Sequence, residues 1–182
     1  IGEPDDVWTS RVSKKWGDLV PHVRVRPEDG EEYWYTGDGL FEGHPRCAVL
    51  IAGWKEPLPS RPKSLAEADP ACWDPVARLE RMDAYGIWAQ VIYPNVGGFG
   101  SGKFLQLKDP ELMLECVRAY NDFLSDWCAT DSRRLIPITA LPFWDVEASV
   151  AEINRCAKRG HKGILFGNQP ETYGLPYMAD PH

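Results

Sequence analysis

From residue 73 onward, the chain alternates between helical and strand-like patterns of apolar residues. A helix is predicted after Asp74 and Pro75, because an aspartate N-cap followed by proline at the first helical position is a common helix start. Gly86 can end this helix in the left-handed conformation. The apolar residues between these limits recur at helical spacing and share one face: Val76, Leu79, Met82 and Tyr85.

Two further helices are predicted from the same signals. Asp109 and Pro110 repeat the cap and the proline. The long apolar face that follows them consists of Leu112, Cys116, Tyr120, Phe123, Leu124 and Trp127. Asp145 can cap a third helix, and Gly160 can end it. The predicted apolar face of this third helix consists of Val146, Val150, Ile153 and Ala157.

Three short apolar runs lie between and after these helices and are predicted strands: residues 87–93, 135–141 and 163–166. They are nearly continuous in apolar residues, which is typical of parallel strands buried on both faces under covering helices. The alternation of helices and strands predicts an α/β fold with a parallel sheet. An open doubly wound sheet and a barrel both satisfy this pattern, and periodicity alone does not choose between them.

Residues 1–72 are irregular by contrast, with many prolines and glycines. Within them, residues 22–26 and 32–36 alternate in polarity around an Asp-Gly turn, which predicts a β-hairpin. We expect residues 1–72 to form an irregular N-terminal segment with this hairpin as an insertion, and residues 73–182 to carry the β/α repeats. Both parts are expected to belong to one domain, because 182 residues suit a single hydrophobic core.

Composition and charge narrow the class of protein. Hydrophobic residues make up 43% of the chain and charged residues 26%, which is ordinary for a globular domain. Twenty basic residues against 27 acidic ones give a net charge of −7. A negative surface repels phosphate backbones, so we expect no nucleic-acid partner. The uncharged run 84–102 contains Pro94, Asn95 and several glycines, so it is no lipid-facing helix, and we expect no membrane partner.

The cysteines indicate the compartment. They are scattered and form no C-x-x-C pair: Cys47, Cys72, Cys116, Cys128 and Cys156. Such spacing is typical of free thiols in a reducing compartment. The first eight residues show neither the basic nor the apolar region of a signal peptide. We therefore expect a cytoplasmic protein.

One glycine-rich segment suggests a different function. The residues from Gly97 to Lys103 satisfy the G-x-x-x-x-G-K pattern of a phosphate-binding loop directly after a predicted strand. Such a loop needs serine or threonine next, to place a hydroxyl on Mg²⁺, and Phe104 occupies that position. We interpret the segment as a glycine-rich loop and keep a nucleotide-binding α/β module as the alternative function.

The histidines and the acids do not complete an active site. The four histidines form no metal-binding motif: His22, His44, His161 and His182. His44 and Cys47 by themselves do not make a zinc site, which takes three or four protein ligands. Helix capping already explains Asp74, Asp109 and Asp145. We assign no catalytic residue and no metal ligand from the residues alone.

Several segments occur together in a familiar order. In chain order, they are 3–8 (EPDDVW), 73–86 (WDPVARLERMDAYG), 89–94 (AQVIYP), 119–122 (AYND) with Trp127, 134–137 (RLIP), 141–142 (LP) and 163–166 (GILF). In this order and spacing they resemble the amidohydrolase-related metal-dependent hydrolases. That TIM-barrel family includes aminocarboxymuconate semialdehyde and resorcylate-type decarboxylases. The resemblance covers nearly the whole chain.

The resemblance implies the first half of a (β/α)8 barrel, with residues 87–93, 135–141 and 163–166 as strands two, three and four. It also implies a divalent metal, Zn²⁺ or Mn²⁺, that activates water or polarises a substrate oxygen before C–C cleavage. The D-x-H or H-x-H pair of this family would end just before Ile1, and its further His and Asp ligands would follow His182. The metal ligands are therefore expected outside this chain.

Active sites of such barrels lie at the carboxyl ends of the strands. The residues that follow the three predicted strands are therefore the candidates for the wall of a substrate pocket: Tyr93, Asn95, Phe143, Trp144, Phe166 and Asn168. His161 precedes its strand and is expected at the opposite face.

The function implied by the resemblance is that of the N-terminal part of a metal-dependent hydrolase or decarboxylase. Its substrate would be a small organic molecule, carboxylated or aromatic. The implied partners are that substrate, the remaining half of the barrel and, as an open alternative, a second copy in a homo-oligomer. A non-catalytic α/β fragment stays a third alternative, beside the enzyme and the nucleotide-binding module.

Overall fold

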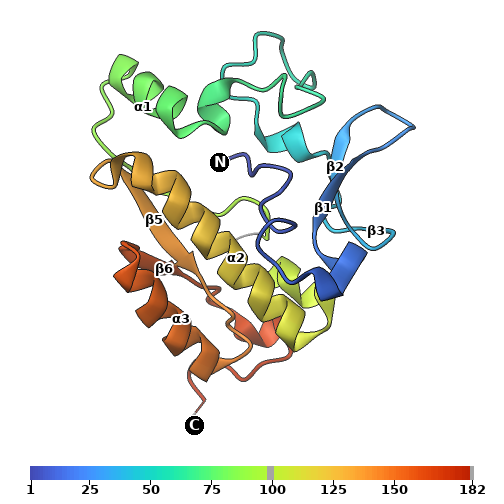
Figure 1. Cartoon of the computed structure of the whole chain (residues 1–182), viewed down its shortest axis with the longest axis vertical. Helices are drawn as coiled ribbons and strands as arrows, with labels where there is room; N and C mark the ends of the chain where they lie inside the picture. Colours follow the sequence, from blue (N-terminus) through green and yellow to red (C-terminus); the bar gives the residue numbers. More distant parts are fainter. Residues whose placement is uncertain (98–100, 181–182) are drawn as a thin grey trace.

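The computed structural model describes residues 1–97 and 101–180, in which the strands form two three-stranded sheets (Figure 1). The first sheet is antiparallel, in the order β1–β2–β3. Its strands are β1 (His22–Val25), β2 (Glu32–Thr36) and β3 (Gly39–Leu40). Val23 pairs with Trp34 across the hairpin, and Gly30 supplies a φ of +70° in the turn. The predicted hairpin is confirmed, and β3 extends it by a strand that the sequence pattern did not indicate.

The second sheet is parallel, in the order β4–β5–β6. Its strands are β4 (Gln90–Ile92), β5 (Leu135–Ala140) and β6 (Gly163–Leu165). The α-helices of the β/α part of the chain are α1 (Pro75–Ala84), α2 (Pro110–Cys128) and α3 (Val146–Lys158). Gln90 lies opposite Leu135, and Ile138 lies opposite Gly163. Helix α2 connects β4 to β5, and α3 connects β5 to β6. The predicted α/β fold with parallel strands is confirmed.

All three α-helices begin at the predicted caps. The side chains of Asp74, Asp109 and Asp145 accept hydrogen bonds from first-turn backbone N–H groups at 2.8–3.2 Å. These bonds satisfy donors that the helix itself leaves without partners. Beyond the ends of α1 and α3, Gly86 and Gly160 have φ values of +69° and +97°, as expected for left-handed helix ends.

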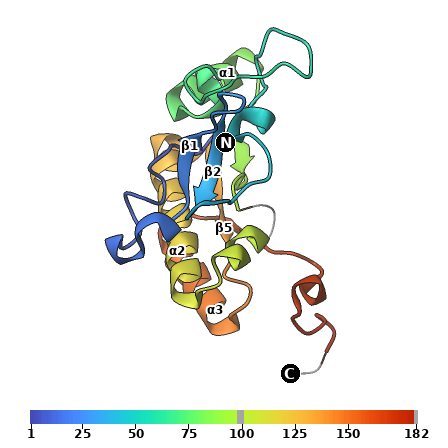
Figure 2. The ribbon, with the colours of Figure 1, turned by 90° about the vertical axis from the view of Figure 1, so that its right-hand side faces the viewer.

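Short 3-10 helices complete the described secondary structure: η1 (Lys14–Leu19), η2 (Arg46–Val49), η3 (Pro70–Cys72), η4 (Gly102–Leu107), η5 (Ala129–Asp131) and η6 (Pro170–Tyr173). Helix η6 belongs to the segment after β6, which Figure 2 shows projecting away from the sheet and the helices. Within the described residues, no helix is both long enough and apolar enough to cross a membrane.

An aromatic core joins the N-terminal part to the β/α part. Trp8 is fully buried, with its ring centroid 5.0 Å from that of Trp34 and 6.0 Å from that of Tyr120. Its indole nitrogen donates a hydrogen bond to the Cys116 carbonyl of α2 at 3.0 Å. Helix α2 also packs on β5, so it contacts both parts of the chain. The division at residue 72 stays a prediction.

The predicted burial of the parallel strands is wrong for the two outer strands. Strand β5 is buried along most of its length, because β4 and β6 flank it and α2 covers it. Val91 of β4 is 50% exposed, and Ile164 of β6 is 43% exposed. Each outer strand has only one neighbouring strand among the described residues, so these side chains lack a covering layer there.

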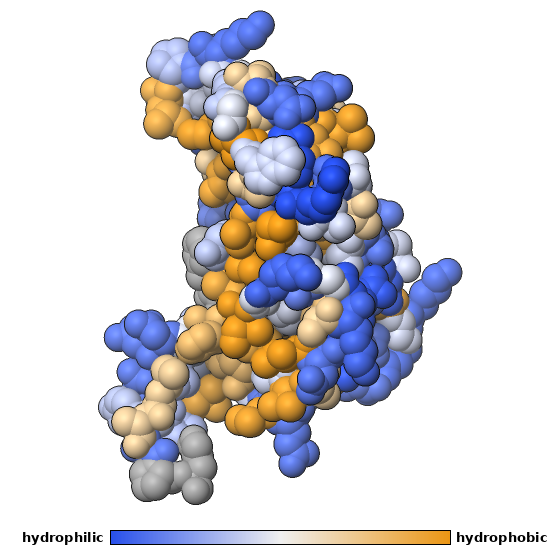
Figure 3. Space-filling view, turned by 90° about the vertical axis from the view of Figure 1, so that its left-hand side faces the viewer, coloured by the Kyte–Doolittle hydropathy of each residue, from blue (hydrophilic) through white to orange (hydrophobic). Residues whose placement is uncertain are grey.

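Helix α3 buries a different face from the predicted one. Val146 and Val150 are 73% and 53% exposed. The buried positions of this helix are Ser149, Glu152 and Cys156. Glu152 Oε1 accepts a hydrogen bond from Asn121 Nδ2 of α2 at 2.8 Å, which directs the polar face inward. Figure 3 views the side on which β5, β6 and α3 lie in Figure 1, and it shows a band of hydrophobic residues along this side.

Candidate functional site

The carboxyl ends of the three parallel strands meet at one edge of the second sheet. The predicted pocket residues follow these ends: Tyr93 and Asn95 after β4, Phe143 and Trp144 after β5, and Phe166 and Asn168 after β6. The two aromatic residues after β5 are partly buried, whereas the two residues after β6 are exposed. After β4, Asn95 is partly buried and Tyr93 is 46% exposed.

An aromatic cluster lies beyond the end of β5. The ring centroid of Phe143 lies 5.3 Å from that of Trp144 and 5.2 Å from that of Tyr173. A Cβ at Gly102 would lie 2.6 Å from the Tyr173 hydroxyl, so a larger residue at this position would require the ring to shift. Tyr173 is a single aromatic residue in an irregular segment, so no sequence pattern marked it. The cluster presents aromatic faces and edges, which suit contact with a planar organic molecule.

Glu3 connects the N-terminal segment to the carboxyl end of β4. Its side chain is almost fully buried, and its Oε1 atom accepts three hydrogen bonds. The donors are the backbone N–H of Asn95 at 3.1 Å, the backbone N–H of Val96 at 3.0 Å and the Tyr120 hydroxyl at 3.0 Å. Glu3 therefore holds the loop that carries Asn95. No sequence pattern indicated this role for Glu3, because its partners are 92 or more residues away and follow no spacing rule.

The Tyr120 hydroxyl acts as a donor in this arrangement. Burial of the ring, together with the neighbouring Glu3 carboxylate, raises the pKa of Tyr120 well above its ordinary value. The phenol therefore stays protonated at neutral pH and donates its hydrogen to Glu3. The Tyr120 phenol thus serves to position the loop and is not poised to transfer a proton.

The glycine-rich loop lies partly outside the described residues, which leave out 98–100. In its described part, Lys103 Nζ lies 3.5 Å from Glu42 Oε2. Phe104 is buried in the aromatic core, and a Cβ at Gly97 would lie 2.8 Å from its ring. The lysine thus pairs with an acid, and the next residue anchors the loop in the core. These contacts do not favour a phosphate-binding role.

The buried thiols and His161 are poor candidates for catalysis. Burial raises the pKa of Cys47 and Cys128 to about 12, so these thiols stay protonated at neutral pH. His161 precedes β6 and is buried, with its two ring nitrogens 2.9 Å from Ser125 Oγ and 3.0 Å from Thr139 Oγ1. This imidazole is fully engaged in linking α2 to β5.

A family model described as amidohydrolase matches residues 14–180, which is nearly the whole chain. The chain belongs to the amidohydrolase family. The resemblance inferred from the order of segments is thereby confirmed.

The chain is similar to two kinds of decarboxylase. It is 26% identical over 158 residues to 2-amino-3-carboxymuconate-6-semialdehyde decarboxylase from Dictyostelium discoideum, covering 83% of this chain and 40% of that protein. It is 31% identical over 108 residues to gamma-resorcylate decarboxylase from Rhizobium radiobacter, covering 54% of this chain and 32% of that protein. The chain therefore matches less than half the length of these relatives.

A solved structure shows the same fold. An amidohydrolase from Mycobacterium avium subsp. paratuberculosis K-10 superposes with a TM-score of 0.66 at 21% identity, covering 88% of this chain and 45% of that chain. At this identity, the likeness concerns the fold alone.

Amidohydrolases are generally metal-dependent, and a metal site needs several ligands that converge on one point. Among the described residues, no three His, Cys, Asp or Glu side chains converge on a point that could hold an ion. His44 Nε2 lies 3.4 Å from Glu42 Oε2, and this pair has no third ligand in the described part of the chain. The residues present therefore do not fit the metal that the amidohydrolase family implies.

Proposed function

We propose that this chain forms the first half of a (β/α)8 barrel, with β4, β5 and β6 as strands two, three and four. The observation that carries the proposal is the parallel order β4–β5–β6 with one α-helix between successive strands. Barrel strands follow one another in space in this way. The exposure of Val91, Val150 and Ile164 supports the proposal, because further strands and helices would cover such side chains in a closed barrel.

We propose that the whole protein is a metal-dependent enzyme, a decarboxylase or a hydrolase that acts on a small carboxylated or aromatic molecule. The names of the two decarboxylase relatives support this substrate class. Zn²⁺ or Mn²⁺ would be held by residues outside this chain, and when bound it would activate water or polarise a substrate oxygen.

The residues of this chain would form part of the substrate pocket. The aromatic rings would pack against the substrate, and the two asparagine amides would offer hydrogen bonds. These residues are Tyr93, Asn95, Phe143, Trp144, Phe166 and Asn168. Their position after the carboxyl ends of the strands supports this role.

We further propose a cytoplasmic location and a small-molecule substrate as the main ligand, with no membrane or nucleic-acid partner. The described cysteines are free and buried, which supports a reducing compartment. The macromolecular partners would be the remaining half of the barrel and, in a homo-oligomer, a second copy.

The proposed activity can be tested on the protein encoded by the whole reading frame that contains residues 1–182. We expect CO₂ release from an aromatic carboxylic acid such as gamma-resorcylate, lost on chelation and restored by Zn²⁺ or Mn²⁺. Metal-dependent cleavage of an amide or ester instead would assign the protein to the hydrolases. A protein that turns over neither class of substrate with added metal would contradict the proposal.

A further inference from the structure

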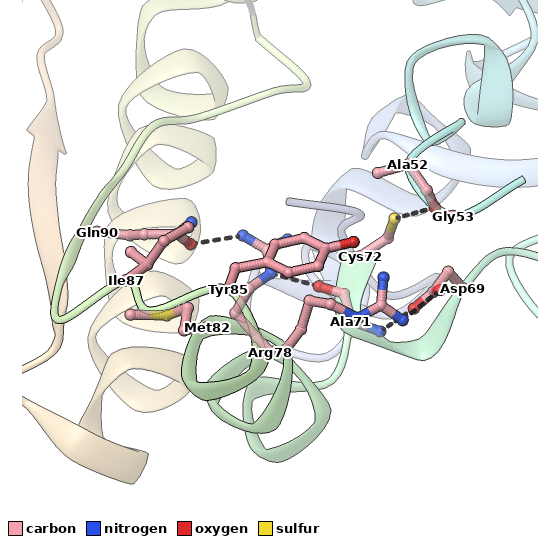
Figure 4. Close-up of a pocket in the computed structure, with 11 residues that line it drawn as sticks. Ala52, Gly53, Asp69, Ala71, Cys72, Arg78, Met82, Tyr85, Ile87 and Gln90 are labelled. Atoms are coloured by element: carbon pink, nitrogen blue, oxygen red, sulfur yellow. Dashed lines mark hydrogen bonds and ion pairs between the residues drawn. The ribbon is translucent and has the colours of Figure 1, made fainter.

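A cavity of about 230 Å³ lies at the amino end of β4, away from the carboxyl edge that carries the pocket candidates (Figure 4). Its polar lining groups are the side chains of Asp69, Arg78, Arg81, Tyr85 and Gln90 and the Cys72 thiol. The apolar part of its wall comes from α1, from the segment after α1 and from the N-terminal part of the chain. These apolar residues are Ala52, Ala71, Met82 and Ile87. A concave, mostly apolar site with a few polar groups is typical of small-molecule binding.

Two arginines line this cavity, and only Arg81 forms an ion pair with a carboxylate of the described residues. Arg81 Nη2 lies 2.7 Å from Asp69 Oδ2, so its charge is neutralised. Arg78 donates to the carbonyl oxygen of Ala71 and, at 3.2 Å, to the Gln90 amide oxygen, and both acceptors are neutral. No carboxylate of the described residues forms an ion pair with Arg78, and its Nη2 has no hydrogen-bond acceptor there. Asp69 attracts both guanidinium groups, so two positive charges face one negative charge and the charged lining residues of the cavity sum to +1.

The surroundings of Arg78 make this charge costly without a partner. Burial lowers the pKa of the Arg78 guanidinium, yet an arginine side chain stays protonated at neutral pH. Its planar group lies 5.9 Å from the ring centroid of Trp127, which restricts its orientation. An oriented guanidinium with free N–H groups matches the two oxygens of a carboxylate.

We propose that this cavity binds a small organic carboxylate, with its carboxyl group on Arg78 and its apolar body against Met82 and Ile87. The apolar wall favours an organic anion over a bare inorganic one, because an inorganic anion would lose water without gaining apolar contacts. The site lies at the opposite end of β4 from Asn95, so it does not depend on the proposed enzyme function.

Benzoate is a suitable probe, and the measurement is isothermal titration calorimetry of the metal-free protein encoded by the whole reading frame that contains residues 1–182. We expect one benzoate to bind per chain, and benzamide, which has the same shape without the charge, to bind at least tenfold more weakly. Arg78→Gln should weaken benzoate binding at least tenfold. The matched control is Arg133→Gln, which removes an exposed arginine side chain and should leave binding unchanged.

A second variant keeps the proposal testable if Arg78→Gln fails to fold. Ala52 lines the cavity and is exposed, so Ala52→Phe should block the space without touching the Arg78 hydrogen bonds, and should also weaken binding at least tenfold. Absence of saturable benzoate binding, or equal binding by the wild type and Ala52→Phe, would overturn the site. Tighter binding of inorganic phosphate than of benzoate would overturn the assignment to an organic carboxylate.

Discussion

At the scale of single residues, Glu3 is expected to stabilise the fold because its Oε1 atom accepts three hydrogen bonds. Replacing Glu3 with alanine would leave the Asn95 and Val96 N–H groups and the Tyr120 hydroxyl buried without an acceptor. Each such loss is expensive, so we expect Glu3→Ala to lower the free energy of unfolding by about 3 kcal/mol. Tyr120→Phe removes one donor and should cost about 1 kcal/mol. Urea unfolding measures both values.

The matched control for Glu3 is Asp6→Ala, because Asp6 belongs to the same segment and is exposed. We expect this variant to unfold within about 0.5 kcal/mol of the wild type. If Glu3→Ala were as stable as Asp6→Ala, the hydrogen bonds around Glu3 would contribute nothing to holding the loop.

Because His161 is buried, we expect the stability of the chain to depend on pH. Burial lowers its pKa below the ordinary value, although the Glu152 charge and a nearby backbone group act in the other direction. The His161 imidazole therefore takes up a proton at higher pH in the unfolded chain than in the folded chain. Its contribution to stability is present above about pH 6.5, and it is lost as the pH falls below that value. His161→Gln removes the titrating group but can still hydrogen-bond to Ser125 and Thr139.

Unfolding free energies of the wild type and of His161→Gln, measured between pH 8 and pH 5, test this prediction. The stability of the wild type should fall more steeply toward acid than that of the variant. Parallel curves for the two proteins would show that His161 does not change its protonation on folding.

At the scale of secondary structure, α3 buries a polar residue and leaves part of its predicted apolar face exposed. Glu152 accepts hydrogen bonds from Asn121 at 2.8 Å and from Arg155 at 2.7 Å. Burial alone would raise the pKa of Glu152, but these hydrogen bonds outweigh it and hold the pKa below the ordinary value. Val150, on the predicted apolar face, is 53% exposed.

We therefore expect Glu152→Ala to destabilise the chain by about 3 kcal/mol, as when a buried ion pair loses one partner. Val150→Ala should change stability by less than about 0.5 kcal/mol, because its side chain already contacts water. Chemical unfolding of the two variants gives the comparison. A larger loss for Val150→Ala would mean that α3 buries its apolar face in solution.

At the scale of the whole molecule, the outer strand β6 leads us to expect that copies of the chain associate with one another. It pairs with β5 along one edge only among the described residues, and Ile164 and Phe166 are 43% and 49% exposed. An open apolar edge promotes pairing with another chain. We expect the 182-residue chain, made alone, to sediment as a concentration-dependent oligomer and to bind an apolar dye. Ile164→Lys should weaken both effects.

The control for this prediction is Leu58→Lys, which changes an exposed residue outside the strands and should leave association unchanged. A compact monomer that binds no dye and unfolds cooperatively would contradict the prediction. It would also contradict the half-barrel proposal, since the strands would then need no further cover.

The sequence by itself determined the features that depend on residues close together in the chain. The starts of α1, α2 and α3 followed from Asp-Pro pairs or a single aspartate, because a cap bonds only to the next turn. The hairpin followed from alternation around an Asp-Gly turn. The family followed from the order of several short segments, and a family match over residues 14–180 confirmed it.

Only the tertiary structure decided the features that depend on distant partners. Glu3 accepts a hydrogen bond from Asn95, and Glu152 accepts one from Asn121. Arg78 lines a cavity together with residues of the N-terminal part. No local sequence pattern predicts these long-range contacts. The burial of the apolar strands also escaped the sequence pattern. Apolarity indicates which side chains gain by leaving water, but burial requires a neighbouring layer, and among the described parallel strands only β5 has strands on both sides.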